Sequence, residues 1–449
     1  MRQRTPHGLL YSIGNFGTSL SSFAVSTYMG YFYIALVGLP PRWVGWGLFA
    51  FSWWNAFNDP VAGWLSDRTR TRWGRRVPYI AVLTLPLAVS FAAVWAPPLA
   101  TGRPASLFIY MLLAVTINDL LYTLVAINLA ALFPEMFATL ASRARVNGWR
   151  QIMSLGGMIV GVVLAPLIAE RYGWPVMGAI LGGVLAAALL LSLRGSREHR
   201  AYAQLRESRL RWSVGSALRH RAFLIVLGIG FLIRLALTTV NATMPFYASY
   251  VLGTGTRGAA WLLGATLLVA LLAMQVWAGL LARWGVRRTL LVAQLAVGVA
   301  VLPLLVAQTL LAALATAALA GFSLAGLLIT PEVLLAEVID ADHVRTGQRH
   351  EGMYFGLSNF ANRLPNVLQA VGVGEMLTLV GFDATLAVQP PEVILGLRVL
   401  IGGVPLVALT LAALLTWVYP LHGARLAEVR ERVTVLRGAI EGDERGANS

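Results

Sequence analysis

Apolar runs of about 20 residues recur along the chain, with short polar connections between them. A helix of about 20 residues crosses the hydrocarbon core of a bilayer, where only helices or closed barrels satisfy every backbone polar group. The pattern therefore predicts an all-α membrane protein with twelve transmembrane helices. We expect them over residues 9–37, 43–65, 78–97, 106–132, 150–170, 174–193, 222–251, 258–281, 288–307, 310–335, 353–380 and 393–420.

A longer polar segment in the middle of the chain divides these helices into six and six. It predicts an N-terminal six-helix bundle (1–193), a cytoplasmic central loop (194–221), a C-terminal six-helix bundle (222–420) and a cytoplasmic tail (421–449). A weak internal repeat agrees, because the loops after helices two and eight end in the similar sequences WGRR (73–76) and WGVRR (284–288). Short basic loops can also resemble one another without a repeat, and this alternative stays open.

The arginines are distributed unevenly between the two sides of the predicted bundle. All 35 basic residues are arginine, and 27 of them fall in the termini and the connections on one side. Only Arg42, Arg103, Arg171 and Arg257 fall on the other. The positive-inside rule then places both termini in the cytoplasm of a multi-pass protein of the inner (plasma) membrane. The net charge of +15 needs no nucleic acid, because these arginines lie beside anionic lipid headgroups.

The residue types that are missing exclude several chemistries. The chain has no cysteine, so disulfides, thiolate metal sites and cysteine nucleophiles are excluded. Without lysine it has neither a phosphate-binding Walker A loop nor a Schiff-base lysine. No metalloprotease HExxH or hydrolase GxSxG sequence is present. We therefore expect neither an enzyme nor an ATP-driven pump, and no cofactor beyond a coupling ion.

Two long motifs resemble those of a known family. They are WNAFNDPVAGW (54–64), continuing into DRTRTRWGRRVPY (67–79), and DHVRTGQRHEG (342–352) before helix eleven. The opening YSIGNFG (11–17) and the pair Pro134-Glu135 fit as well. The chain resembles the glycoside–pentoside–hexuronide:cation symporters, the melibiose permease branch of the major facilitator superfamily. The broader group includes the sodium-dependent lysophosphatidylcholine symporter. The resemblance implies two six-helix pseudo-repeats with a site at midplane between them.

The sugar-binding positions that the resemblance implies depart from the family pattern. Two acids of the family fall at Ser19 and Ala126, and an aromatic position falls at Ala130. The lysine of helix eleven becomes Arg363, while the arginine of helix five is kept as Arg150. We therefore expect weak or no galactoside binding.

Three polar residues of helix two form a candidate cation site. Asn55, Asn58 and Asp59 lie at i, i+3 and i+4, on one helix face. A carboxylate inside a membrane is costly and marks a functional site, and oxygen ligands suit a hard cation such as sodium. Alternatively Asp59 takes a proton, ends the helix or joins a structural ion pair. The family has an acid where this chain has Asn55, so we expect weaker sodium dependence or proton coupling.

Arginines within the spans indicate the charge of the substrate. Arg150, Arg234 and Arg363 each need a carboxylate, carbonyl, water or anionic substrate, and Asp59 and Asp119 are the acids available. The excess of one positive charge favours a substrate with a carboxylate or phosphate. The alternatives are that an arginine snorkels to the interface and that Asp119 pairs with one of them. Further candidates are Asn15, Ser19 and Ser22 on helix one, and Tyr122, Asn128, Asn359 and Asn362 elsewhere.

Charged loop residues predict a conformational latch. Asp67 with Arg68 and Arg75 is one group, as the family resemblance suggests, and Glu135 with Arg143 is a second.

These features together predict a sodium- or proton-coupled secondary active symporter. It would move a small organic solute, such as a glycoside, hexuronide or other anionic or polar substrate, by alternating access. The first alternative is a lysophospholipid symporter or flippase of the same fold, and the second is a non-transporting substrate sensor. We expect a monomer whose partners are the substrate and the lipid bilayer, without nucleic acid.

Overall fold

Regular structure in this protein is helical. The computed structural model describes residues 5–69, 71, 74–98, 103–137, 140–196, 220–346, 351–423, 425–429 and 431–432. Over these residues the helices are accompanied by a single isolated bridge between Thr71 and Gly74, and no strand forms. The predicted all-α fold is confirmed.

The helices of the N-terminal half pack mainly on one another. Two of them, α1 and α5, run on into short π-helical or second helical segments. The elements are α1 (Thr5–Tyr31) with η1 (Phe32–Leu36), α2 (Pro41–Arg68), α3 (Val77–Val94), α4 (Pro104–Met136), α5 (Leu140–Ile159) with η3 (Val160–Leu164) and α6 (Ala165–Tyr172), and α7 (Trp174–Leu193).

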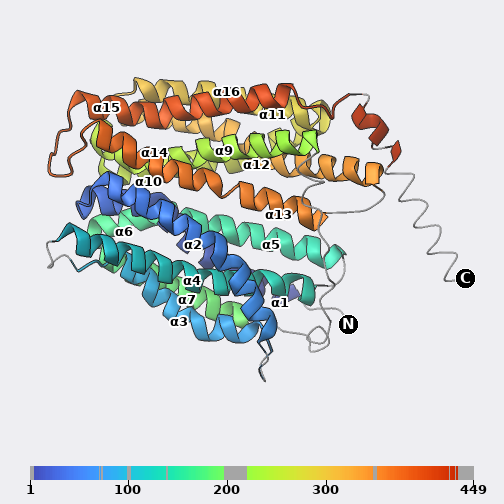
Figure 1. The fold of residues 1–449 in the computed structure, drawn as a ribbon, viewed down its shortest axis with the longest axis horizontal. Coiled ribbons are helices and arrows are strands. Elements are labelled where there is room, and N and C mark those ends of the chain that lie inside the picture. The colour runs from blue at the N-terminus through green and yellow to red at the C-terminus, as the bar shows by residue number, and fades with distance from the viewer. Residues whose placement is uncertain are drawn as a thin grey trace, which may run out of the picture.

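The helices of the C-terminal half form a second layer above the first (Figure 1). α2 of the N-terminal half and α14 of the C-terminal half pack side by side where the layers meet. The elements are α9 (Arg221–Phe246) with η5 (Tyr247–Val251), α10 (Gly255–Trp284), α11 (Val286–Val301) with η6 (Leu302–Leu305), α12 (Leu310–Thr346), α13 (Glu351–Ala361), α14 (Leu364–Leu379), and α15 (Pro391–Arg398) with η7 (Val399–Gly403) and α16 (Val404–Trp417).

Most of these helices are apolar enough to cross a membrane. Within the described residues, nine helical segments meet the requirement by length and composition alone. Their outward faces are apolar, as Val89 of α3 (69% exposed) and Leu272 of α10 (70%) illustrate. The remaining long segments are α1, α2 and α13–α14, which complete the twelve predicted helices. α13 has 11 residues and α14 has 16, so neither alone is long enough to span the bilayer. α1 and α2 carry several of the polar candidate residues.

The prediction of one continuous helix over 353–380 is wrong. The segment breaks into α13 and α14, with Asn362 and Arg363 in the turn between them. Pro365 in the first turn of α14 explains the break, because a proline lacks the N–H for a helical hydrogen bond and its ring clashes with the preceding turn. Arg363 therefore lies at a joint rather than on a rigid helix.

Glycines allow the closest helix contacts, as expected for GxxxG pairs in membranes. A β-carbon at Gly157 would overlap the carbonyl oxygen of Phe16 in α1, and one at Gly161 would lie 2.5 Å from that of Leu20. One at Gly182 would lie 2.8 Å from the carbonyl oxygen of Ala88 in α3. These glycines are therefore positions of close helix packing.

Equivalent positions of the two halves share local structure. Gly74 and Gly285 both have a positive φ, 106° and 75°, and each lies just before a helix, α3 or α11. α1 and α9 both continue into a π-helical turn, η1 and η5. These shared features agree with two pseudo-repeats of one ancestral bundle.

Candidate functional site

A cavity of about 560 Å³ lies between the two halves of the protein. Residues from α1, α2, α4, α5 and η3 line it on one side, and residues from α9, α10, α11, η6, α12 and α14 on the other. Most of these side chains are leucine, valine, methionine, alanine or phenylalanine, so the wall is largely apolar. A cavity of this size and character fits a small organic molecule with only a few polar contacts.

A polar stripe along α9 forms part of the C-terminal wall, to which α10 and α14 add Thr266, Asn366 and Gln369. Arg234, Thr238 and Asn241 all line the cavity, and their spacing of four and three residues places them on one helix face. No hydrogen bond or ion pair joins the guanidinium of Arg234 to another residue in the described part of the chain. A guanidinium stays charged at any accessible pH. The cavity therefore contains a positive charge that is not neutralised by another described residue.

The polar part of the N-terminal wall comes from α1, α4 and, through Ser52, α2. Ser22, Asp119 and Tyr122 line the cavity opposite the α9 stripe. The site thus presents one carboxylate and one guanidinium on opposite halves, separated by apolar surface.

Several predicted substrate residues lie away from this cavity lining. Ser19 hydrogen-bonds Ser154 of α5 across 2.7 Å, and the guanidinium carbon of Arg150 lies 4.5 Å from the centre of the Phe133 ring. Asn359 is exposed on α13. Asn15 lies on α1 with a buried amide oxygen that has no partner among the described residues. Of the predicted substrate residues, Tyr122 and Arg234 line the cavity, on opposite walls.

Arg363 belongs instead to a polar chain that joins the two halves. Its Nη1 donates to the Asn55 side-chain oxygen at 2.7 Å and to the Asn55 backbone oxygen at 3.2 Å. The Asn55 amide nitrogen donates to Asp119 Oδ1 at 2.7 Å. The Asn58 amide nitrogen donates to Asp119 Oδ2 at 3.0 Å. Asp119 is therefore linked to an arginine, but through an asparagine rather than directly.

Other predicted residues lie outside what the structure describes. The side chains of Asp59, Asp67, Glu135 and Arg143 are not among the described ones, so the roles predicted for them stay predictions. Arg68 is the last residue of α2, and Arg75 follows Gly74 in the turn before α3. The cytoplasmic latch built on these residues also stays a prediction.

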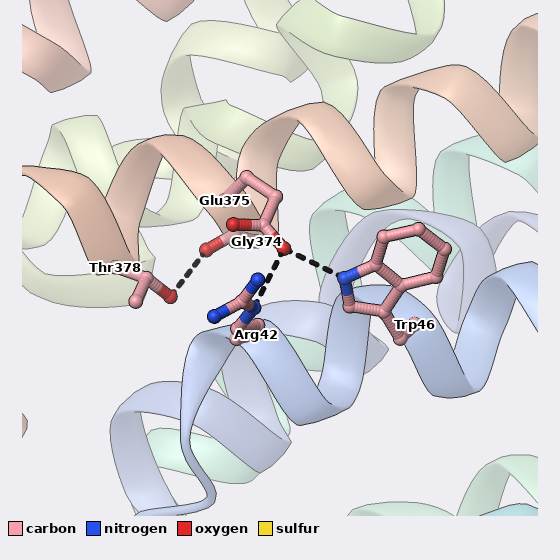
Figure 2. A network of polar contacts seen from close by, with 5 residues as sticks. All are labelled: Arg42, Trp46, Gly374, Glu375 and Thr378. Atoms are coloured by element: carbon pink, nitrogen blue, oxygen red, sulfur yellow. Dashed lines mark hydrogen bonds and ion pairs between the residues drawn. The ribbon is translucent and has the colours of Figure 1, made fainter.

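A cluster around Glu375 ties the halves together at one end of the molecule. Glu375 Oε1 of α14 accepts hydrogen bonds from Arg42 Nε at 3.0 Å and from Trp46 Nε1 at 2.6 Å, both of α2 (Figure 2). We call these three residues the Glu375 clamp. The end of the molecule that contains them is called the closed end.

Two glycines bring the helix backbones of α2 and α14 together beside the clamp. A β-carbon at Gly374 would lie 2.6 Å from the carbonyl oxygen of Pro41 and 3.0 Å from the α-carbon of Gly45. A side chain at either position would therefore meet backbone, which cannot move aside easily. The carbonyl of Gly374 itself accepts a hydrogen bond from the Thr378 hydroxyl at 2.8 Å, one turn along α14 (Figure 2).

Further contacts join the halves at the same end. The hydroxyls of Tyr31 and Ser249 lie 2.9 Å apart. Glu170 of α6 accepts hydrogen bonds from the Thr256 hydroxyl at 3.0 Å and the Arg257 backbone nitrogen at 2.6 Å in α10. The halves therefore meet closely here.

Glu375 was not among the predicted site residues. Its signal in the sequence is an acid within an otherwise apolar run, which marks a functional candidate inside a membrane. Its partner Arg42 lies far away in the sequence, so the pair is visible only after the helices are packed.

Comparisons with known proteins agree with this architecture. Residues 10–423 match the family described as MFS/sugar transport protein. The chain is 27% identical over 435 residues to a glucuronide carrier protein homolog of Escherichia coli, covering 93% of each chain. It is 22% identical over 482 residues to the sodium-dependent lysophosphatidylcholine symporter 1-A of Danio rerio, covering 97% of this chain and 89% of the relative.

A shorter match has higher identity. An uncharacterized symporter of Synechocystis is 35% identical over 165 residues, which span 36% of this chain and only 30% of the relative. Among solved structures, a bacterial homolog of the human lysosomal transporter Spinster, inward-facing and unoccupied, matches with a TM-score of 0.68. That match is 14% identical and covers 93% of this chain and 98% of the other, so it shows a shared fold.

Proposed function

The chain belongs to the MFS/sugar transport protein family, and from this premise we propose a cation-coupled symporter that moves a small organic solute by alternating access. The observation that carries the proposal is the cavity between the halves. The Glu375 clamp joins α2 and α14 at one end of this cavity. Alternating access requires a site between two bundles. Each bundle moves as a rigid body relative to the other, so that the site opens to one side of the membrane at a time.

The distribution of arginines indicates which end of the protein faces the cytoplasm. The arginine-rich connections lie opposite the closed end, and the positive-inside rule assigns that side to the cytoplasm. The closed end then faces outward, away from the cytoplasm.

The cavity supports a substrate that carries an anionic group. Arg234 supplies the one guanidinium among the described residues that line the cavity, and Thr238 and Asn241 add hydrogen-bonding groups beside it. A hexuronide or another solute with a carboxylate would match this wall. The glucuronide carrier homolog supports the same class of substrate.

The apolar walls favour a second candidate, a lysophospholipid. Its phosphate would lie at Arg234, and its acyl chain against side chains such as Leu262, Met274 and Leu324. The relative named as a lysophosphatidylcholine symporter has the same breadth of match to this chain.

Replacing Arg234 with glutamine tests the substrate site. We expect the affinity for an anionic substrate to fall by about 10- to 100-fold, because a hydrogen bond to a charged group contributes about 1.5–3 kcal/mol. Uptake of radiolabelled glucuronide and of lysophosphatidylcholine into proteoliposomes measures it. The matched control is Arg398→Gln, since Arg398 lies outside the cavity lining and its Nη2 donates to the Ala307 carbonyl at 3.4 Å. Unchanged affinity for both substrates would exclude Arg234 from the site.

A further inference from the structure

The cavity reaches beyond the space between the halves, into the C-terminal bundle. Its lining includes Val297 and Val301 of α11 and Leu304 of η6. These two elements pack on helices of their own half, α11 on α10, α12 and α16, and η6 on α12 and η7. A cavity that touches them therefore has a branch that passes between helices of one bundle.

We call the residues that line this branch the side pocket. They come from α10, α11, η6 and α12, and they are Leu262, Thr266, Val297, Val301, Leu304 and Ala317. Five of them are apolar and at most 5% exposed. The hydroxyl of the sixth, Thr266, donates to the backbone oxygens of Leu262 at 2.9 Å and Ala317 at 3.2 Å. The side pocket therefore offers apolar surface, and its one hydroxyl proton is already used by the backbone.

The side pocket and Arg234 lie at different depths in the membrane. Arg234 precedes Ser249, a contact of the closed end, by fifteen residues, which is about 22 Å of helix. Leu262 follows Thr256, another contact of that end, by six residues, or about 9 Å. The backbone at Leu262 is therefore roughly 13 Å nearer to the closed end than the backbone at Arg234. A single ligand that reaches both must be elongated.

One face of α9 connects the two points. Thr238, Asn241 and Met244 follow Arg234 at intervals of four, three and three residues, which places all four on one side of the helix. All four line the cavity. Along this face the wall changes from a cation to hydrogen-bonding groups and then to an apolar side chain. A ligand that matches the wall carries its charge at one end and its apolar part at the other.

We propose that the side pocket binds the alkyl or acyl substituent of an anionic substrate whose charged group lies at Arg234. The inference rests on the proposed transport of an anionic solute and narrows that solute to an amphiphile. Burial of apolar surface is what the side pocket supplies, and each methylene removed from water strengthens binding by about fourfold. A compact hexuronide would use only the polar wall and would leave the side pocket empty.

Binding to the purified full-length protein in lipid nanodiscs tests the proposal without transport. The probes are methyl, butyl and octyl β-glucuronide and the corresponding alkyl phosphates, measured by calorimetric titration against empty nanodiscs. With at least one of the two headgroups, we expect the octyl compound to bind at least 10-fold more tightly than the methyl compound, because only the longer chain reaches the side pocket. The headgroup that binds distinguishes a glycoside-type substrate from a phospholipid-type substrate.

Filling the side pocket should remove this dependence on chain length. In Ala317→Phe the methyl compound should bind as it does to the wild type, while the octyl compound should lose at least 10-fold in affinity. The matched control is Ala315→Phe, which adds the same ring to an exposed position of α12 two residues earlier and should leave both affinities unchanged. Arg234→Gln should instead weaken both compounds by a similar factor, because both place their charge there.

An enlarged side pocket provides a test that does not depend on the folding of Ala317→Phe. Val301→Ala removes two methyl groups from the wall, so the affinity for a dodecyl compound relative to the octyl compound should rise several-fold. The proposal is overturned if the wild type binds methyl and octyl compounds equally or binds neither octyl compound. It is also overturned if folded Ala317→Phe keeps its octyl affinity, or if Val301→Ala leaves the preferred chain length unchanged. Binding that depends on chain length in a protein that transports none of these compounds would contradict only the proposed function.

Discussion

Replacing Gly374 with valine is expected to reduce net uptake by about 10- to 100-fold. A side chain at this position would press on the carbonyl oxygen of Pro41 and the backbone of Gly45. Overpacking of this kind costs about 1–3 kcal/mol, and every 1.4 kcal/mol changes a population about tenfold. The cost arises only in states in which α2 and α14 are in contact at the closed end. The population of the outward-open state should therefore rise in the variant.

The absence of cysteine makes this shift measurable. A single Ser249→Cys substitution places a thiol at the closed end, where Ser249 contacts Tyr31. A membrane-impermeant maleimide should label it slowly in the wild-type background and at least several times faster with Gly374→Val. Gly372→Val is the matched control, because a β-carbon there meets no atom within 4 Å. Unchanged labelling together with normal uptake would show that α2 and α14 need not approach closely during transport.

Replacing Asp59 with asparagine is expected to abolish uphill accumulation. If its carboxylate holds the coupling cation, the neutral variant should still exchange substrate across the membrane but should concentrate it no further than equilibrium. Counterflow and gradient-driven uptake in proteoliposomes, each with a sodium or a proton gradient, separate the two activities.

The matched control for this experiment is Asp383→Asn, which removes one negative charge from the loop before α15. Gradient-driven accumulation at the normal rate in Asp59→Asn would remove Asp59 from the coupling mechanism. Loss of exchange as well as accumulation would point to a structural role for Asp59.

The helices were predictable because the bilayer imposes a simple rule on the sequence. An apolar run of sufficient length inside a bilayer is helical, and glycine pairs such as Gly157 and Gly161 are typical of close helix packing. The break before Pro365 was also visible in the sequence, since proline interrupts the helical hydrogen bonds. Hydrophobicity alone does not reveal this break, because the apolar stretch continues through it.

The cavity was less predictable because it depends on how each helix is rotated. Arg150, Arg234 and Arg363 are all single charges on largely apolar helices, and nothing in their spacing says which one faces the centre. In the structure Arg234 lines the cavity, Arg150 lies over the Phe133 ring and Arg363 donates to Asn55. The approach of Asp119 to Asn55 likewise depends on packing between helices far apart in sequence.

The exposure of the Glu375 clamp has a consequence for how the carrier responds to voltage. Arg42 is 62% exposed and Glu375 is 28% exposed in their side chains, and ion pairs of this kind contribute about 1 kcal/mol or less. A membrane potential of 100 mV is worth about 2.3 kcal/mol for each charge that crosses the full field. The electrical work done on one moving charge can therefore exceed what the ion pair contributes to closure. Hyperpolarising the cell should then change how often the carrier faces each side, even at constant substrate concentration.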